Sequence, residues 1–284
     1  MKLGHVFVLS LLAAAAPAPA GDFGSFAFDG ESVSLTEGCV VVPHFNSLGG
    51  ETPDAVVLLA SKALDCDAYA SWVTPGNGAF ADVVKAADGG LLTIELGAGL
   101  KLSRLSVQGV GYTLGGDPCQ GCNVNIEAGG AGLRGSVATG TPLMDGKVAI
   151  AAKFDLPKPA GPAKGEALAG GGEPGKAYVA YLKAYADGDY EALKALMPEG
   201  KAEDEFGWYE DAERSEGIKS QGSMEPKSAK IVEGWKIGNG ALLVTELPSP
   251  HGDATRYRGY ASLGFDGKAW RVRESRLDWS SPIE

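Results

Sequence analysis

The sequence contains little histidine and none of the common catalytic motifs. Only three histidines occur among the 284 residues, and only His44 and His251 lie beyond the first 20 positions. Two isolated histidines do not make a histidine metal cluster. Gly-x-Ser-x-Gly, His-Glu-x-x-His and a phosphate loop ending in Gly-Lys-Ser/Thr are all absent. The sequence therefore predicts neither a bound metal nor a cofactor.

Basic residues are outnumbered by acidic ones, 25 to 36, which gives a formal net charge of −11 and a pI near 4.8. An acidic chain repels the phosphate backbone, so nucleic acid is not an expected partner. Glycine is abundant, with 42 residues, but without a Gly-X-Y repeat, which excludes collagen. This much glycine favours many turns between short strands.

Long apolar runs are scarce, and the longest one lies at the N-terminus. Val6–Ala16 is interrupted only by Ser10 and is too short for a transmembrane helix. Lys2 precedes it, and Ala18-Pro19-Ala20 follows with a small-x-small cleavage pattern. We therefore expect residues 1–20 to be a signal peptide cut after Ala20. The mature protein is expected to be periplasmic or extracellular, with no transmembrane segment; a retained signal anchor is the alternative.

Four cysteines in an exported chain predict disulfides rather than free thiols. Turn-rich residues surround Cys119 and Cys122, which favours a bond between these two and leaves Cys39 to pair with Cys66. A redox-active Cys-x-x-Cys is disfavoured, because the alternating segment Asn123–Glu127 follows it. A helix N-terminus, which would lower the thiol pKa, is not expected there. A zinc site is also disfavoured, because one Cys-x-x-Cys supplies only half of a tetrahedral ligand set.

Residues 21–157 consist of short, alternating, β-branched segments separated by glycine-containing turns, which predicts a β-sandwich-like domain. Residues 158–174 are rich in Pro, Gly and Ala without a periodic apolar face, which predicts a flexible linker. The expected elements of the first part are strands at Ser25–Asp29, Cys39–Phe45, Ala55–Ser61, Leu91–Leu96, Leu100–Val107, Asn123–Glu127, Leu133–Thr139 and Lys147–Phe154, and a short helix at Ala68–Trp72.

The pattern changes in residues 175–284. Tyr178, Tyr181, Leu182 and Tyr185 follow the i, i+3, i+4, i+7 spacing of one helix face. Asp189 is placed to cap a second helix, which ends before Pro198. The expected elements are helices around residues 178–185, at Tyr190–Met197 and at Ala202–Lys219, and strands at Ala229–Ile237, Ala241–Leu247, Thr255–Phe265 and Ala269–Trp279.

The segment Tyr181–Leu193, YLKAYADGDYEAL, resembles the opening of the SnoaL-like, or nuclear transport factor 2-like, superfamily. There, a first helix ends in a Gly-Asp turn and a second helix begins at once. The resemblance covers about residues 175–280 and implies an α+β cone, in which a curved sheet wraps helices around a pocket. The expected fold class is thus two domains: an N-terminal all-β sandwich-like domain and a C-terminal SnoaL-like α+β cone, joined by a flexible linker.

Aromatic and charged side chains predict a ligand pocket in this cone. Strand alternation puts Tyr257 and Trp270 on the inward face, and continuing it along the last strand brings Glu274 and Arg276 inward or to the rim. The alternative is that the aromatics are ordinary core and the charges a solvated strand end. The predicted ligand-binding residues are Tyr181, Tyr185, Trp208, Trp235, Tyr257, Trp270, Glu274 and Arg276.

No catalytic residue is expected in the C-terminal part. Its one histidine, His251, lies in a proline-flanked loop, and Arg276 should hold Glu274 ionised and its pKa low, which makes a weak general base. The superfamily includes enzymes, ligand-binding proteins and interaction modules, so the resemblance leaves function open. We expect an exported, non-catalytic binding or interaction protein of the cell envelope, for a small apolar ligand or a protein partner. The alternatives are a small SnoaL-like hydrolase or isomerase and a structural envelope protein.

Overall fold

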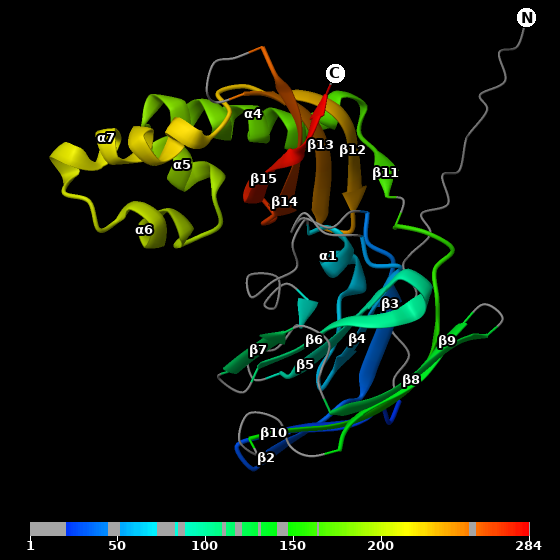
Figure 1. Cartoon of the computed structure of the whole chain (residues 1–284). Coiled ribbons are helices and arrows are strands. Elements are labelled where there is room, and N and C mark those ends of the chain that lie inside the picture. The colour runs from blue at the N-terminus through cyan, green and yellow to red at the C-terminus, as the bar shows by residue number, and fades with distance from the viewer. Residues whose placement is uncertain are drawn as a thin grey trace, which may run out of the picture.

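The computed structural model describes residues 21–44, 52–72, 83–84, 89–109, 112–116, 121–129, 132–140, 147–163, 165–249 and 254–283. The predicted signal peptide, Cys119 and His251 lie outside these ranges. The strands of the described part form three antiparallel sheets of five strands each, shown in Figure 1.

The first sheet has the strand order β2-β1-β10-β9-β8. Residues of β10 alternate between buried and exposed along nearly its whole length. One face of this sheet is therefore covered and the other is open to solvent. The strands are β1 (Gly24–Phe28), β2 (Glu31–Ser34), β8 (Cys122–Gly129), β9 (Gly132–Thr139) and β10 (Val148–Pro157).

The second sheet has the order β3-β4-β5-β6-β7. All six residues of β4, AVVLLA, are buried, so this sheet is covered on both faces. A short helix, α1 (Cys66–Ala70), follows β4 and is capped by Asp65, whose carboxylate accepts from the backbone N–H of Ala68. The strands are β3 (Glu37–Val41), β4 (Ala55–Ala60), β5 (Leu91–Gly97), β6 (Lys101–Gly109) and β7 (Tyr112–Gly116).

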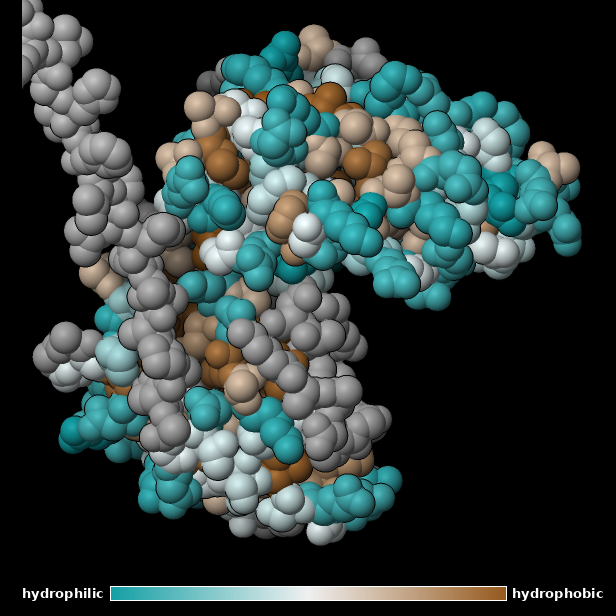
Figure 2. Space-filling model, turned by 180° about the vertical axis from the view of Figure 1, so that it is seen from behind, coloured by the Kyte–Doolittle hydropathy of each residue, from teal (hydrophilic) through white to brown (hydrophobic). Residues whose placement is uncertain are grey.

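The third sheet has the order β11-β12-β13-β14-β15 and carries the four longer helices on one face (Figure 1). From behind, the surface over these helices is largely hydrophilic (Figure 2). The strands are β11 (Glu166–Ala167), β12 (Lys230–Ile237), β13 (Gly240–Pro248), β14 (Arg256–Phe265) and β15 (Trp270–Ile283). The helices are α4 (Gly172–Asp187), α5 (Tyr190–Leu196), α6 (Lys201–Phe206) and α7 (Asp211–Gln221).

Three apolar clusters hold these layers together. The first lies between the first two sheets and includes Phe154 and Val57. The second lies between the third sheet and its helices and includes Tyr178 and Leu263. The third lies on the other face of the second sheet, where Leu58 is buried in one cluster with α1 and with residues of β12 and β13.

The predicted fold class is wrong. It assigns a separate N-terminal β domain and a C-terminal cone on a flexible linker, whereas the chain forms three antiparallel sheets with a core that crosses the predicted boundary. Val56 and Leu58 of β4 are buried in the same cluster as Ile237 and Leu242 of the third sheet. The physical reason is the composition of β4, whose continuous apolar run needs cover on both faces.

The segment predicted to be a linker also takes part in the structure. Residues Glu166 and Ala167 form β11, which pairs with Lys236 and Trp235 of β12. The carbonyl of Ala163 lies 2.8 Å from Nε2 of His44. These contacts tie the segment to both halves of the chain. The domain boundaries at residues 157 and 175 stay a prediction.

Candidate functional site

A β-bulge in β15 decides where the predicted charged pair lies. Register between β14 and β15 shifts between Ser262 and Leu263, where Arg273 is the extra residue of β15. Leu263 pairs with Val272 on the helix-covered face, whereas Ser262 pairs with Glu274. An extra residue in one strand moves the following side chains to the opposite face. The predicted inward alternation from Trp270 to Arg276 is therefore wrong.

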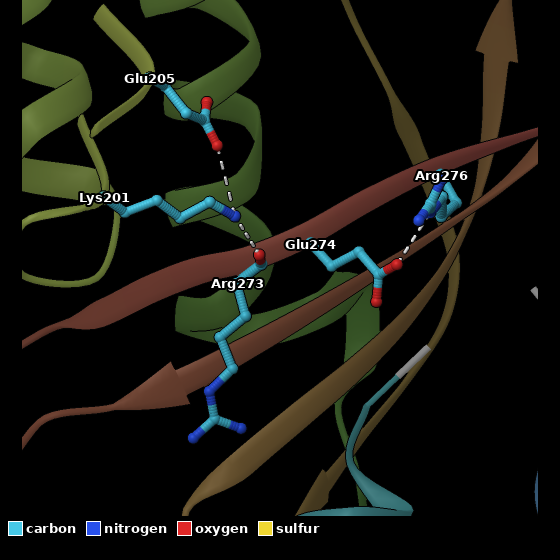
Figure 3. Close-up of polar contacts among 5 residues, drawn as sticks. All are labelled: Lys201, Glu205, Arg273, Glu274 and Arg276. Carbon is cyan, nitrogen blue, oxygen red and sulfur yellow. Dashed lines mark hydrogen bonds and ion pairs between the residues drawn. The ribbon is translucent and has the colours of Figure 1, made fainter. Parts of the chain in front are cut away.

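Glu274 and Arg276 lie on the face of the third sheet opposite to the helices. Their partners on β14 are Ser262 and Tyr260. The intervening Ser275 instead faces the helices, where its hydroxyl lies 2.9 Å from the hydroxyl of Tyr178. Arg276 Nε donates to Glu274 Oε1 at 2.8 Å, and Figure 3 shows the two side chains pointing toward one another.

The bulge is held from the helical side. Nζ of Lys201 in α6 donates to the carbonyl oxygen of Arg273 at 2.6 Å, as drawn in Figure 3. The side chain of Arg273 extends the other way, and its guanidinium lies 5.3 Å from the ring centre of Trp72 and 3.4 Å from Oγ of Ser71. One residue thus links α6 to the segment after α1.

The predicted aromatic residues do not form one site. Tyr181 and Tyr185 are buried between α4 and the third sheet, with ring centres 5.3 Å apart. Trp270 packs against the same cluster, and Tyr257 is half-buried opposite Leu247. These four lie on the helix-covered face.

Trp235 and Trp208 lie elsewhere. Trp235 stacks on His44, with ring centres 4.8 Å apart, in the cluster that joins the third sheet to the second. Trp208 follows α6 and is 67% exposed. As a ligand-binding set, the eight residues stay a prediction.

A carboxyl that the sequence did not single out lies near the tyrosines. Burial raises the pKa of Glu225; Arg276 opposes this shift, and Glu205 adds to it. Burial also raises the pKa of Tyr181 and Tyr185, and both carboxylates add to these shifts. The result is a pair of tyrosines held neutral beside Glu225, whose carboxyl keeps its proton to a higher pH than an ordinary glutamate.

A concave surface lies at the other end of the molecule, on the open face of the first sheet. This groove has a volume of about 590 Å³. Its lining residues come from the segment before β1 and from β8, β9 and β10. They are Gly21, Asp22, Phe23, Asn125, Glu127, Arg134, Gly135, Ser136, Lys153, Phe154, Asp155 and Leu156.

The groove presents fixed charges of both signs. Glu127, Arg134 and Asp155 form one row across β8, β9 and β10, and Arg134 donates from Nε to Asp155 at 2.9 Å. Asn125, Ser136 and Lys153 form the adjacent row. The sequence could have indicated this surface, because charged or polar residues alternate with apolar ones in β9 and β10.

Two groove charges lack a partner. Within the described residues, neither the Lys153 ammonium nor the Glu127 carboxylate makes a hydrogen bond or an ion pair. Strand spacing and rise place these two positions about 12 Å apart. The groove thus offers a cation and an anion on either side of the Arg134–Asp155 pair, which fits a ligand that carries both charges.

The disulfide prediction is confirmed for one pair. Cys39 in β3 is bonded to Cys66 at the start of α1. Cys122 is also in a disulfide, while its predicted partner Cys119 lies outside the described residues. Over the described ranges, no three His, Cys, Asp or Glu side chains come together as a metal site. In the same part of the chain, no helix is both long and apolar enough to cross a membrane.

Comparison with known proteins gives one distant structural likeness. No protein-family model and no curated protein matches the sequence. A solved structure described as "Ntf2 like protein involved in plasmid conjugation" has 10% sequence identity and a TM-score of 0.26, covering 88% of this chain and 79% of that chain. At this TM-score the likeness does not define the fold, and membership in the SnoaL-like superfamily stays a prediction.

Proposed function

We propose that the protein is an exported, non-catalytic binding protein of the cell envelope, and that the groove on the first sheet is its binding site. Lys153 and Glu127, which make no ion pair with any residue that the structure describes, lie on either side of the Arg134–Asp155 pair and carry this proposal. Their separation corresponds to about three or four residues of extended chain. The ligand is therefore a short chain with both charges, such as a peptide segment. Of the two expectations from the sequence, a small apolar ligand or a protein partner, this proposal is closer to the second.

Binding is tested with a defined probe. A capped pentapeptide, lysine and glutamate separated by three glycines, is titrated into the 15N-labelled mature protein. Backbone amide shifts should change in β8, β9 and β10. Lys153→Met and Glu127→Gln should each weaken binding, because each leaves one ligand charge without its partner. Lys227→Met, at an exposed lysine outside the groove, should leave it unchanged. Shifts elsewhere, or equal binding by all variants, would contradict the proposal.

Export is tested by processing. N-terminal sequencing of protein recovered from outside the cytoplasm should begin at Gly21. The cysteine pairs support this part of the proposal, because disulfides persist in oxidising compartments. Recovery of the chain in the cytoplasm with Met1 retained would contradict it.

The enzyme alternative is favoured by one observation, the raised pKa of Glu225 beside Tyr181 and Tyr185. A carboxyl whose pKa is raised by burial is better suited to general acid or base work than an ordinary glutamate. If this is the function, turnover of a screened ester or ketone substrate should depend on Glu225 and should be lost in Glu225→Gln, while Glu274→Gln retains it.

A further inference from the structure

Trp208 is held in a fixed position but is not packed into the core. Its side chain is among the exposed large hydrophobic ones, with 67% of the residue open to solvent. The indole Nε1 donates to the carbonyl oxygen of Glu205 at 2.9 Å. One ring face stacks on Tyr209, with ring centres 3.7 Å apart. The indole N–H is thus satisfied, and the ring is oriented at little further entropic cost on binding.

Tyr209, the base of this stack, is itself anchored to α7. Its ring lies against Gly217, where an added Cβ would come within 2.4 Å of the ring. Gln221 donates to its hydroxyl at 3.2 Å, and Arg214 donates to its carbonyl oxygen at 3.0 Å. The glycine makes room for the tyrosine, and the tyrosine supports the tryptophan. The outer face of the Trp208 ring is thereby held in a fixed orientation and stays exposed to solvent.

The surroundings of this platform are strongly acidic. Residues 199–216 hold eight acidic and two basic residues, a formal charge of −6 within a chain of −11. Within the described residues, Glu199, Asp204, Glu210 and Glu213 make no side-chain ion pair. The surface over α6 and α7 is correspondingly hydrophilic in Figure 2. An apolar partner surface would contact one aromatic ring and would otherwise face carboxylates. An anionic membrane would be repelled by their negative charge.

We infer that Trp208 and the carboxylates of residues 199–216, hereafter the acidic platform, dock a lysine- or arginine-rich segment of a partner protein. A guanidinium over the free face of the indole gains a cation–π contact, and neighbouring positive charges pair with the free carboxylates. Trp is also enriched among residues that dominate binding energy at interfaces. The acidic platform is separate from the groove, so a negative binding result at one of these sites does not bear on the other.

The test uses a capped decapeptide of alternating arginine and glycine. Addition of the peptide to the 15N-labelled mature protein should shift the indole N–H signal of Trp208, assigned by its loss in Trp208→Ala. Affinity should fall as salt rises from 50 to 300 mM. Trp208→Ala should weaken binding about threefold or more, the amount expected for one exposed cation–π contact. Circular dichroism of the variant checks that it is folded.

A matched pair of charge variants distinguishes binding at the acidic platform from attraction by the overall negative charge of the protein. Glu210→Gln/Glu213→Gln should weaken binding more than Glu31→Gln/Glu233→Gln, which removes the same charge elsewhere. Equal weakening by the two pairs, with no effect of Trp208→Ala, would overturn the inference. Tighter binding to phosphatidylglycerol vesicles than to the peptide would overturn it as well.

Discussion

Arg273 shows that one extra residue in a strand can place the predicted binding residues that follow it on the opposite face of the sheet. Along β15 the apolar residues change from even positions, Trp270 and Val272, to odd positions at Leu277 and Trp279, and this change of parity is the sign of the bulge in the sequence. The bulge depends on a distant group, since Lys201 binds the carbonyl that leaves the ladder. Glu274 and Arg276 consequently lie on the face of the sheet opposite to Tyr181 and Tyr185. Their mutual ion pair, by contrast, was predictable from their spacing in one strand.

Tyr178 provides a prediction at the same scale. Its side chain is fully buried, and burial raises its pKa to about 12, so the hydroxyl stays neutral and bonded to Ser275. Tyr178→Phe should lower the free energy of unfolding by about 1 kcal/mol. Ser275→Ala should cost a similar amount, and the double variant little more than either single one, because the bond is lost only once. Urea denaturation measures all four proteins; strictly additive losses would mean that the two hydroxyls do not interact.

At the scale of elements, most strands and helices could be predicted from the sequence. Alternation and turn residues placed β4 and β5 within a residue of their observed ends, and Asp189 caps α5 as expected. Strands β2, β7 and β11 were missed, and only the pairing with β12 defines the two-residue β11. The groove was missed as well, since it arises where three consecutive strands, β8, β9 and β10, meet the segment before β1, which is distant in sequence.

Glycines at helix boundaries give a second prediction. Gly188 ends α4 with φ +67°, and Gly200 precedes α6 with φ +79°. Both positions strain an L side chain, but an added Cβ at Gly188 would lie 2.4 Å from the carbonyl oxygen of Ser215, whereas Gly200 has open space. Gly200→Ala should cost about 1 kcal/mol, and Gly188→Ala clearly more. Thermal unfolding compares the two; equal losses would show that the contact with α7 is unimportant.

At the scale of the whole molecule, stability should depend on pH through buried acids. Burial raises the folded pKa of Glu225 above the ordinary glutamate value of 4.5. The folded state therefore binds more protons than the unfolded state between these two values. Its contribution to stability is fully present below the unfolded pKa and is lost as pH rises through the folded one.

Glu225→Gln should remove that dependence. The difference in free energy of unfolding between wild type and variant should shift in favour of the variant as pH rises from about 4.5 to neutrality. Urea denaturation at several pH values measures this difference. Glu31→Gln, at an exposed position, should show no such trend; the same trend in both variants would rule out burial of Glu225 as its cause.

We expect the three sheets to unfold as one body, with the groove at one end and the acidic platform at the other. Leu242 is the residue to change, because it belongs to the third sheet and is buried in the cluster that contains Leu58 of the second. Calorimetry of the mature chain should show one cooperative transition. Leu242→Ala should lower the midpoint of that whole transition, with a loss of about 2–5 kcal/mol. Two separate transitions, of which Leu242→Ala moves only one, would contradict the claim.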